Sequence, residues 1–443
     1  MIRSTSYISF FWLSIILIYL IALPDNLIAQ DIGVGLNTTH DENIFDTYNP
    51  LKDQVTQLNL DLSKGWDSDN SYWGVFYAGS LSLYSDLSAR NNHIQMVMAS
   101  MKYHFVHEEP KVSETENDST DAESDSTAEV GSTEIIHSDS LDHFINTTIF
   151  GAAQFNKVDY EEWDNATASG SIIFRQPLGL HASIRPSYTL AFHSYPNISA
   201  LTNIQNIISL HIGTDFLEGS WLALTPTYAF ESYTETQQFS DTLHLKKVIK
   251  GKHGSAMGGL SKVVSINLST PSVQQLALSL LWNYKPVPGT EFTTQITRYA
   301  KPSKEARAVP QLRRGAAKLK SFIVNIDLGQ NNLYDDHFSY YGNELTVQAK
   351  QLLPLDLILE VSLQYQKKTY TYQAMDLSDT IVVASNREDK RTEIAFNFSK
   401  NISLGEDSIL KLEFEYHTFN NGSNAPYYDF KKNTFMVGAE YNF

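Results

Sequence analysis

The sequence predicts an all-β fold, a transmembrane antiparallel up-and-down β-barrel with an even number of strands. Three observations support this prediction. Apolar and polar residues alternate with a period of two in segments of about 9 to 14 residues along the chain. Aromatic residues gather at the ends of these segments, as in the interfacial girdles of membrane barrels; they are Trp163, Tyr195, Tyr233, Trp282, Tyr284, Tyr340, Tyr341, Tyr370, Tyr372, Tyr427 and Tyr428. The last segment stops on a bare aromatic residue, Phe443.

The start of the chain has the pattern of a secretory signal peptide over residues 1–29, and the barrel is predicted over residues 30–443. Arg3 gives the start a positive charge, and a long apolar run follows. Cleavage is expected between Ala29 and Gln30; an uncleaved anchor is the alternative, because the residue three positions before the cut is a leucine. After cleavage no run of about 18 apolar residues remains, so we expect no membrane-spanning helix.

Composition excludes several classes of protein. The chain has no cysteine, which excludes disulfides, thiolate metal sites, a cysteine nucleophile and a lipid attached through cysteine. The net charge is −17, yet residues 107–142 carry twelve acidic residues against one lysine and so supply about −11 of it. We expect this Ser- and Glu-rich segment to be a disordered acidic loop. The acidity argues against a nucleic-acid partner.

Alternating segments follow one another along the chain. Residues 355–366, LDLILEVSLQYQ, place apolar side chains at every second position, and residues 409–417, ILKLEFEYH, do the same. So do residues 58–63 and 321–328. Turn signals separate the segments, at Pro177, Gly219, Pro271, Pro354 and Gly405.

A provisional count gives about 18 strands, with roughly 14 to 18 as the range. It places the acidic segment at the end of the barrel that carries the termini. Because long connections are expected at the opposite end, we expect that one strand before residue 142 is missed or falsely counted.

The two ends of the predicted barrel resemble a known group of proteins. Residues 419–443 and 34–45 are similar to the terminal hairpin and the opening strand of bacterial outer-membrane β-barrel proteins, including the barrels of surface lipoprotein assembly modifiers and of polysaccharide systems. The resemblance implies the outer membrane of a Gram-negative bacterium and an insertion signal, Tyr441 and Phe443, that the barrel assembly machinery reads. The helical-repeat domain of the lipoprotein modifiers has no counterpart in this sequence, which argues against their activity.

Polar positions that alternate with the lipid-facing ones are expected to point into the lumen, because a charge facing lipid costs roughly 2 to 4 kcal/mol at the midplane. A pore lining that sets ion selectivity and a structural polar network are both open interpretations. The proposed lumen and selectivity residues are Lys350, Glu360, Lys411, Glu413, Glu415 and His417, and the further inward positions are Asp61, Lys102, His104, Asp327 and Glu440.

Basic residues gather in two predicted connections. They could bind lipopolysaccharide phosphates or line an anion-selective constriction, and a solvated loop is the alternative. These residues are Lys246, Lys247, Lys250, Lys252, Arg313 and Arg314.

We expect a porin-like channel or export conduit for a hydrophilic solute or polymer, with outer-membrane lipid and lipopolysaccharide around it. One alternative is an anchoring barrel with a closed lumen whose outer loops bind a partner. A less favoured alternative is a barrel hydrolase. Its candidates are two groupings, His40 with Asp41 and Glu42, and His137 with Asp139 and His143, and His40 or His137 would need a serine or carboxylate beside it. Neither grouping carries a motif, so no enzyme activity, catalytic residue, metal site or cofactor is expected.

Overall fold

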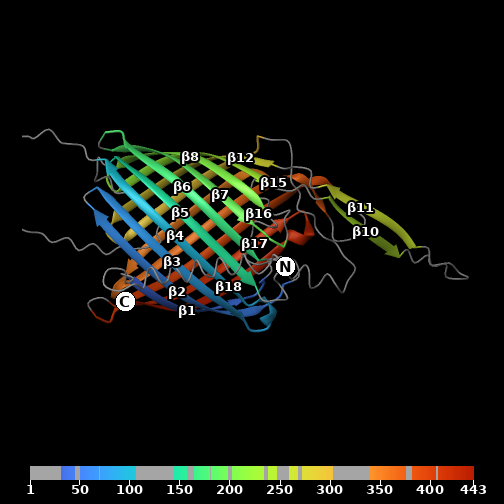
Figure 1. The fold of residues 1–443 in the computed structure, drawn as a ribbon, viewed down its shortest axis with the longest axis horizontal. Helices are drawn as coiled ribbons and strands as arrows, with labels where there is room; N and C mark the ends of the chain where they lie inside the picture. Colours follow the sequence, from blue (N-terminus) through green and yellow to red (C-terminus); the bar gives the residue numbers. More distant parts are fainter. Residues whose placement is uncertain are drawn as a thin grey trace, which may run out of the picture.

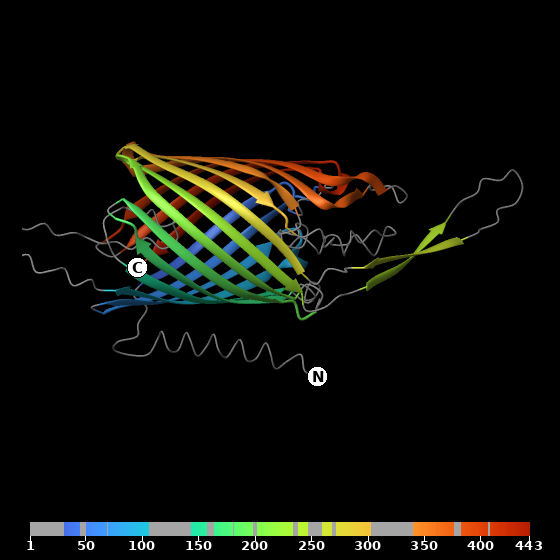
Figure 2. The same cartoon turned by 90° about the horizontal axis from the view of Figure 1, so that it is seen from above.

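The chain forms a closed antiparallel barrel of sixteen strands (Figures 1 and 2). The computed structural model describes residues 31–44, 50–68, 70–105, 143–156, 164–179, 181–197, 202–233, 238–246, 259–267, 272–302, 340–375, 382–405 and 408–443. Within these ranges, no helix is long and apolar enough to cross a membrane.

The strands of the first half of the wall are β1 (Asp31–Asp41), β2 (Asp53–Ser68), β3 (Ser71–Tyr84), β4 (Asn92–Phe105), β5 (His143–Asn156), β6 (Asn165–Pro177), β7 (Ala182–Ser194), β8 (Asn203–Leu217) and β9 (Ser220–Tyr233). The strands of the second half are β12 (Ser272–Val287), β13 (Thr290–Ala300), β14 (Tyr340–Leu353), β15 (Leu357–Met375), β16 (Val382–Ser403), β17 (Ile409–Ser423) and β18 (Phe430–Asn442). Among the described residues, three short 3-10 helices join strands: η1 (Ser88–Arg90), η4 (Pro354–Asp356) and η5 (Pro426–Tyr428).

The wall closes where the two ends of the chain meet. β1 pairs with β2 on one side and with β18 on the other. Ile32 and Phe443 exchange two backbone hydrogen bonds of 3.0 Å at this seam. Each barrel strand therefore has two antiparallel neighbours and the sheet has no edge, which satisfies the backbone polar groups inside a bilayer.

The barrel has fewer strands than the provisional count of about 18. Eighteen strands are described, but β10 (Gln238–Lys246) and β11 (Gly259–Asn267) pair only with each other. β9 pairs directly with β12, so the hairpin between them is left out of the wall, as Figure 1 shows. The even number predicted for the barrel is confirmed, and its value is 16.

Short connections lie at the end of the barrel that carries the termini. β8 and β9 are joined through Gly219, β12 and β13 through Gly289, and β14 and β15 through η4. The connection between β4 and β5 also belongs to this end, because β4 is the fourth strand and returns toward the termini. The expectation that one strand before residue 142 is missed or falsely counted is therefore wrong. Residues 106–142 themselves lie outside the described residues, as does the predicted signal peptide.

The two faces of the wall differ as the alternation predicts. The exterior carries exposed apolar side chains in register across neighbouring strands, such as Leu58 opposite Leu81 and Leu280 opposite both Leu224 and Ile296. Ile149 on this face is 66% exposed. Such a surface would cost much free energy in water, so the barrel spans a bilayer. The opposite face carries mostly polar side chains.

Some tyrosines expected in the aromatic girdles point inward instead. Trp282 and Tyr284 do lie on the exterior, where their rings stack at 5.8 Å. Tyr340 and Tyr370 face each other across β14 and β15 on the inner face and are buried, as is Tyr428. Adjacent tyrosines in a strand must point to opposite faces, so the pair Tyr340 and Tyr341 contributes one ring to each side.

Candidate functional site

The candidate site is the inner wall of the barrel. The exposed apolar residues of each strand mark its outer face, so the residues that alternate with them lie on the inner face. Lys350 on β14 and Glu360 on β15 therefore lie on the inner face, directly opposite each other. The other proposed lumen residues, Lys411, Glu413, Glu415 and His417, follow one another on the inner face of β17. The role of these residues in selectivity stays a prediction.

Carboxylates gather on the strands from β14 round to β2. His417 lies between two of them, with Nδ1 3.2 Å from Glu393 Oε1 and Nε2 2.5 Å from Glu415 Oε1. Lys411 Nζ lies 3.6 Å from Glu413 Oε1. We call this part of the inner face the acidic wall; it consists of Asp61, Glu344, Glu360, Glu393, Glu413, Glu415 and Glu440, with Lys350, Lys411 and His417 among them. Lys368, Arg387, Arg391 and Lys432 lie on the inner face of the same strands, nearer the end opposite the termini.

Amide side chains hold several of these carboxylates in place. Gln364 and Gln366 donate to the two oxygens of Glu344, at 2.8 and 2.7 Å. Asn397 donates to Glu413 at 2.9 Å, and Gln348 donates to Glu360. Because these donors are neutral, they orient the carboxylates without cancelling their charge. The acidic wall therefore keeps a negative field toward the lumen.

Basic side chains gather on another part of the inner face, across β4 to β8. One row of directly opposed residues runs from His104 through Phe144 to Arg175, and a second register pair joins Arg185 to His211. Arg175 and Arg185 lie at the same level on adjacent strands, between the pairs Ile173–Ser187 and Gln176–Ile184. We call this row, with Lys102, the basic wall.

The basic wall surrounds an aromatic ring. Lys102 Nζ lies 4.6 Å and Arg175 Cζ 5.7 Å from the centroid of Phe144, within the range of cation–π attraction. Arg175 Nε and His211 Nε2 are buried and have no hydrogen-bond partner among the described residues. Two facing arginines repel each other, so this wall favours an anionic group beside it.

The two walls lie on opposite sides of the barrel. The strand order around the closed wall runs β1, β18, β17, β16, β15, β14, β13, β12, β9, β8, β7, β6, β5, β4, β3, β2. In this order β6, which carries Arg175, stands eight places from β16, which carries Glu393. Likewise β7, which carries Arg185, stands eight places from β17, which carries Glu415. Half of a sixteen-stranded ring separates them, so the inner surface has a negative side and a positive side.

Other residues proposed from the sequence lie away from this surface. Tyr441 and Phe443 are on the exterior, where their rings stack at 5.3 Å. Lys246 ends β10, outside the barrel wall. Lys247, Lys250, Lys252, Arg313, Arg314 and Asp327 lie outside the described residues.

The histidines considered for catalysis do not form a dyad where they are described. His40 pairs with Phe435 on the exterior, whereas Asp41 points inward and contacts Lys432 Nζ at 2.9 Å. Consecutive residues of a strand cannot share a face, which separates this pair. His143 Nδ1 lies 3.0 Å from Gln176 Oε1, and His137 lies outside the described residues.

Sequence reasoning missed Arg175, Arg185, Glu344 and Glu393. Each stands at an inward position of an alternating segment, so the period of two was the signal that could have found them. Their gathering into walls could not be read from spacing, because it depends on the order of strands around the ring.

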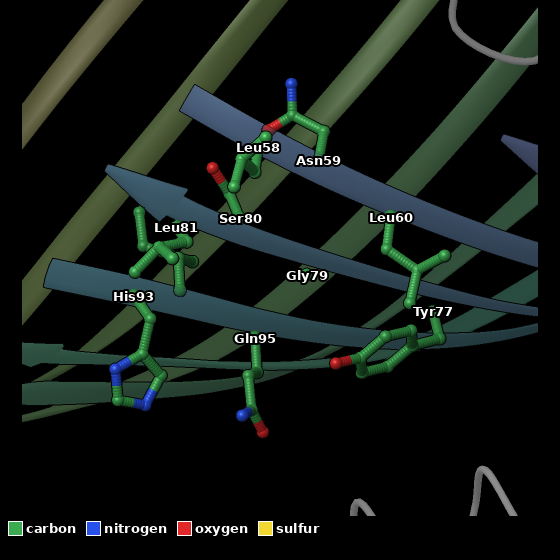
Figure 3. Close-up of a pocket in the computed structure, with 10 residues that line it drawn as sticks. Leu58, Asn59, Leu60, Tyr77, Gly79, Ser80, Leu81, His93 and Gln95 are labelled. Atoms are coloured by element: carbon green, nitrogen blue, oxygen red, sulfur yellow. The ribbon is translucent and has the colours of Figure 1, made fainter. Parts of the chain in front are cut away.

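A groove lies on the exterior, away from the lumen, between β2, β3 and β4 (Figure 3). Tyr77, His93 and Gln95 project to one side of the sheet, and Asn59 and Ser80 to the other. A Cβ at Gly79 would lie 2.9 Å from the Tyr77 hydroxyl, so glycine is needed for the ring to lie across the strand. This groove faces lipid and is separate from the two walls.

The chain has low similarity to known proteins. No family model and no curated protein matches it. Among solved structures, it is similar to OccK10 (OpdN) of Pseudomonas aeruginosa, with a TM-score of 0.41 and 10% identity over 94% of this chain and 98% of that one. It is also similar to OccK3 (OpdO) of the same bacterium, with a TM-score of 0.42 and 12% identity over 93% and 95%.

These likenesses are too distant to bear on mechanism. The predicted outer-membrane β-barrel is confirmed, and it rests on the closed wall and the apolar exterior of this chain. The narrower resemblance to lipoprotein modifiers and polysaccharide-system barrels stays a prediction.

Proposed function

We propose that this barrel is a channel through the outer membrane for hydrophilic solutes, and that its lumen binds solutes that carry an anionic group. We assign the end with both termini to the periplasm, because its connections are tight turns apart from the one between β4 and β5, and we assign the opposite end to the cell surface. Transport requires no covalent chemistry here. The charged walls act by their field on the solute as it passes.

One observation carries the proposal: a wall of carboxylates and a wall of arginines lie on opposite sides of one closed barrel. A field across the lumen turns a dipolar solute so that its anionic group lies near Arg175 and Arg185. Its cationic or hydrogen-bond donor groups then face Glu413 and Glu415. A purely structural network would pair every charge within its own wall. Lys411 with Glu413 and His417 with Glu393 and Glu415 are such pairs, whereas Glu344 is held by the neutral amides of Gln364 and Gln366 and keeps its charge.

The test is ionic conductance of the refolded protein in a planar bilayer, with variants of the facing pair Lys350 and Glu360. Lys350→Glu should raise the preference for cations and Glu360→Lys should lower it, each changing the permeability ratio about two- to tenfold. The double variant Lys350→Glu/Glu360→Lys has the charges of the wild type in exchanged places, so it should return close to the wild-type ratio. It is the matched control for effects on folding.

A folded and inserted barrel without unitary conductance steps would contradict the channel. The function would then be sought in the outer connections, as in the anchoring alternative. If both single variants show conductance steps with an unchanged ion preference, the protein is a channel, but the acidic wall does not set its ion selectivity.

A further inference from the structure

A row of cations lies on the outer surface of the barrel, where no positive charge is needed to line a pore. Arg298 on β13 is directly opposite Asn343 on β14, Asn343 is opposite Lys367 on β15, and Lys367 is opposite Lys390 on β16. All four side chains are exposed. Directly opposed residues have Cβ atoms about 5 Å apart, so three cations and one amide form a continuous row across four strands.

The row lies where the apolar exterior ends. The next outward residues toward the termini are Ile296, Leu345 and Tyr365, which are 52%, 36% and 42% exposed and face one another across the same strands. Beyond the row stands Tyr341, which is 47% exposed. Tyrosines beside lysines at the edge of an apolar belt mark the depth of lipid headgroups. This edge is at the end of the barrel opposite the termini.

The described residues give this row no counter-charge. Within the described part of the chain, no ion pair involves the side chains of Arg298, Lys367 or Lys390. Glu388, on the same face and one pair further along, is opposite Thr369. Lysines placed directly opposite each other, as Lys367 and Lys390 are, destabilise a sheet unless an anion lies between them.

Other sectors of the exterior have a different character at this end. The outward residues near the corresponding ends of β5, β7, β8, β9 and β12 are apolar: Phe155, Phe192, Ile204, Phe230 and Leu276. A general preference for anionic lipid would place cations all round the barrel. Lys431 on β18 is a further exposed exterior lysine at this end, opposite Asn420, so the cations are concentrated on the sector from β13 to β18. This concentration indicates a site.

We propose that Arg298, Lys367 and Lys390 bind the phosphate groups of a lipopolysaccharide molecule in the outer leaflet, with Asn343 as a hydrogen-bond donor between them. Guanidinium and ammonium groups are the side chains that bind phosphate most strongly, and lipid acyl chains would lie against Leu345 and Tyr365 below. The site differs from the basic connections proposed from the sequence. It does not depend on the channel, because the row faces away from the lumen.

The test is native mass spectrometry of the detergent-solubilised full-length protein titrated with purified lipid A. The wild type is compared with Lys367→Gln/Lys390→Gln. The control is Lys64→Gln/Lys400→Gln, which removes two exterior lysines near the opposite end of the barrel. We expect the first variant to bind lipid A at least about tenfold more weakly, and the control to bind like the wild type. Lipid A without its phosphates should bind as weakly to the wild type as intact lipid A binds to the first variant.

The proposal would be overturned if both double variants bound lipid A equally well. It would also be overturned if the wild type bound phosphate-free lipid A as tightly as intact lipid A. Phosphatidylglycerol that competes as well as lipid A would show an unselective anionic surface and would also overturn it. Conductance of the same variants separates this site from the channel, because exterior substitutions should leave ion preference unchanged.

Discussion

Arg387 and Asp389, two residues apart on β16, form an ion pair that is completely buried at the end of the barrel opposite the termini. Arg387 Nε donates to Asp389 Oδ1 at 3.0 Å, and Ser423 Oγ donates to the same oxygen at 2.6 Å. The guanidinium lies between two rings, 4.2 Å from the centroid of Tyr370 and 3.2 Å from that of Tyr428. This cluster ties β15, β16, β17 and η5 together.

Breaking one side of this pair should destabilise the barrel strongly. Arg387→Met leaves a buried carboxylate without its cation, and the expected loss in the free energy of unfolding is about 3 to 5 kcal/mol. Urea unfolding in lipid vesicles, followed by tryptophan fluorescence, measures it. The double variant Arg387→Met/Asp389→Leu should recover much of this loss. A double variant as unstable as the single one would show that ring packing, rather than the isolated charge, is responsible.

Gly219→Ala should weaken the turn between β8 and β9. Gly219 has φ +66°, and a Cβ there would lie 2.6 Å from the carbonyl oxygen of Lys285, whose amide donates to Gly219. The expected cost is about 1 to 3 kcal/mol, from the left-handed backbone and the collision together. Gly179→Ala is the control, because Gly179 has φ +78° but nothing within 4 Å of its Cβ position. Equal losses in urea unfolding would contradict the role of the collision.

Glu42 should make the first connection sensitive to acid. The Asn433 side chain donates to Glu42 at 2.7 Å and Lys52 lies 3.3 Å away, and both lower the pKa of Glu42 below its usual 4.5. A lowered pKa in the folded state means that the contact is complete above about pH 4.5 and is lost as pH falls through the folded-state pKa.

Hydrogen exchange of the Glu42 amide, which donates to the Asn433 carbonyl at 3.1 Å, reports this loss. Protection should fall below pH 4.5 in the wild type after correction for intrinsic exchange. In Glu42→Gln, protection should be insensitive to pH over the same range. A variant that keeps the wild-type pH response would assign the titration to another group.

Phe443→Ser should reduce assembly in cells more than folding in vitro. The Phe443 side chain is 50% exposed on the exterior, so it contributes little to the stability of the barrel. The backbone of residue 443 pairs with Ile32, and this pairing does not depend on the side chain. If the ring is an insertion signal, the amount of barrel in the outer membrane should fall several-fold and the yield of refolding into vesicles should change little. Equal losses in both assays would assign Phe443 a structural role instead.

The faces of the strands could be predicted from the sequence because the period of two needs only local information. Leu357, Leu359 and Leu363 fall on the exterior and Glu360 on the inner face, as the alternation of residues 355–366 predicts. The resemblance of the last residues also placed Tyr441 on the lipid side.

Features that depend on distant pairing could not be predicted. The sequence of β10 and β11 alternates like a wall strand, and only the pairing of β9 with β12 shows that the hairpin stands outside. Arg185 and Glu415 lie on opposite sides of the lumen because the sheet closes into a ring, and the sequence of a single strand does not contain this information. Tyr370 was predicted to lie in an aromatic girdle because it stands near the end of a strand. Its ring instead packs on the guanidinium of Arg387, which belongs to the next strand, β16, and this contact could not be predicted from the sequence of β15 alone.

The antiparallel pairing of the wall limits where residues can be inserted into or deleted from this protein. One residue inserted in the middle of β17 would move Glu413 and Glu415 to the lipid and bring Leu412 and Phe414 toward the water, as far as the next turn. A bulge could absorb the extra residue only by bending the strand out of its neighbours' register. Insertions and deletions in related genes should therefore be confined to the connections, or come in pairs within strands, so that the outer connections can diversify while the wall keeps its length.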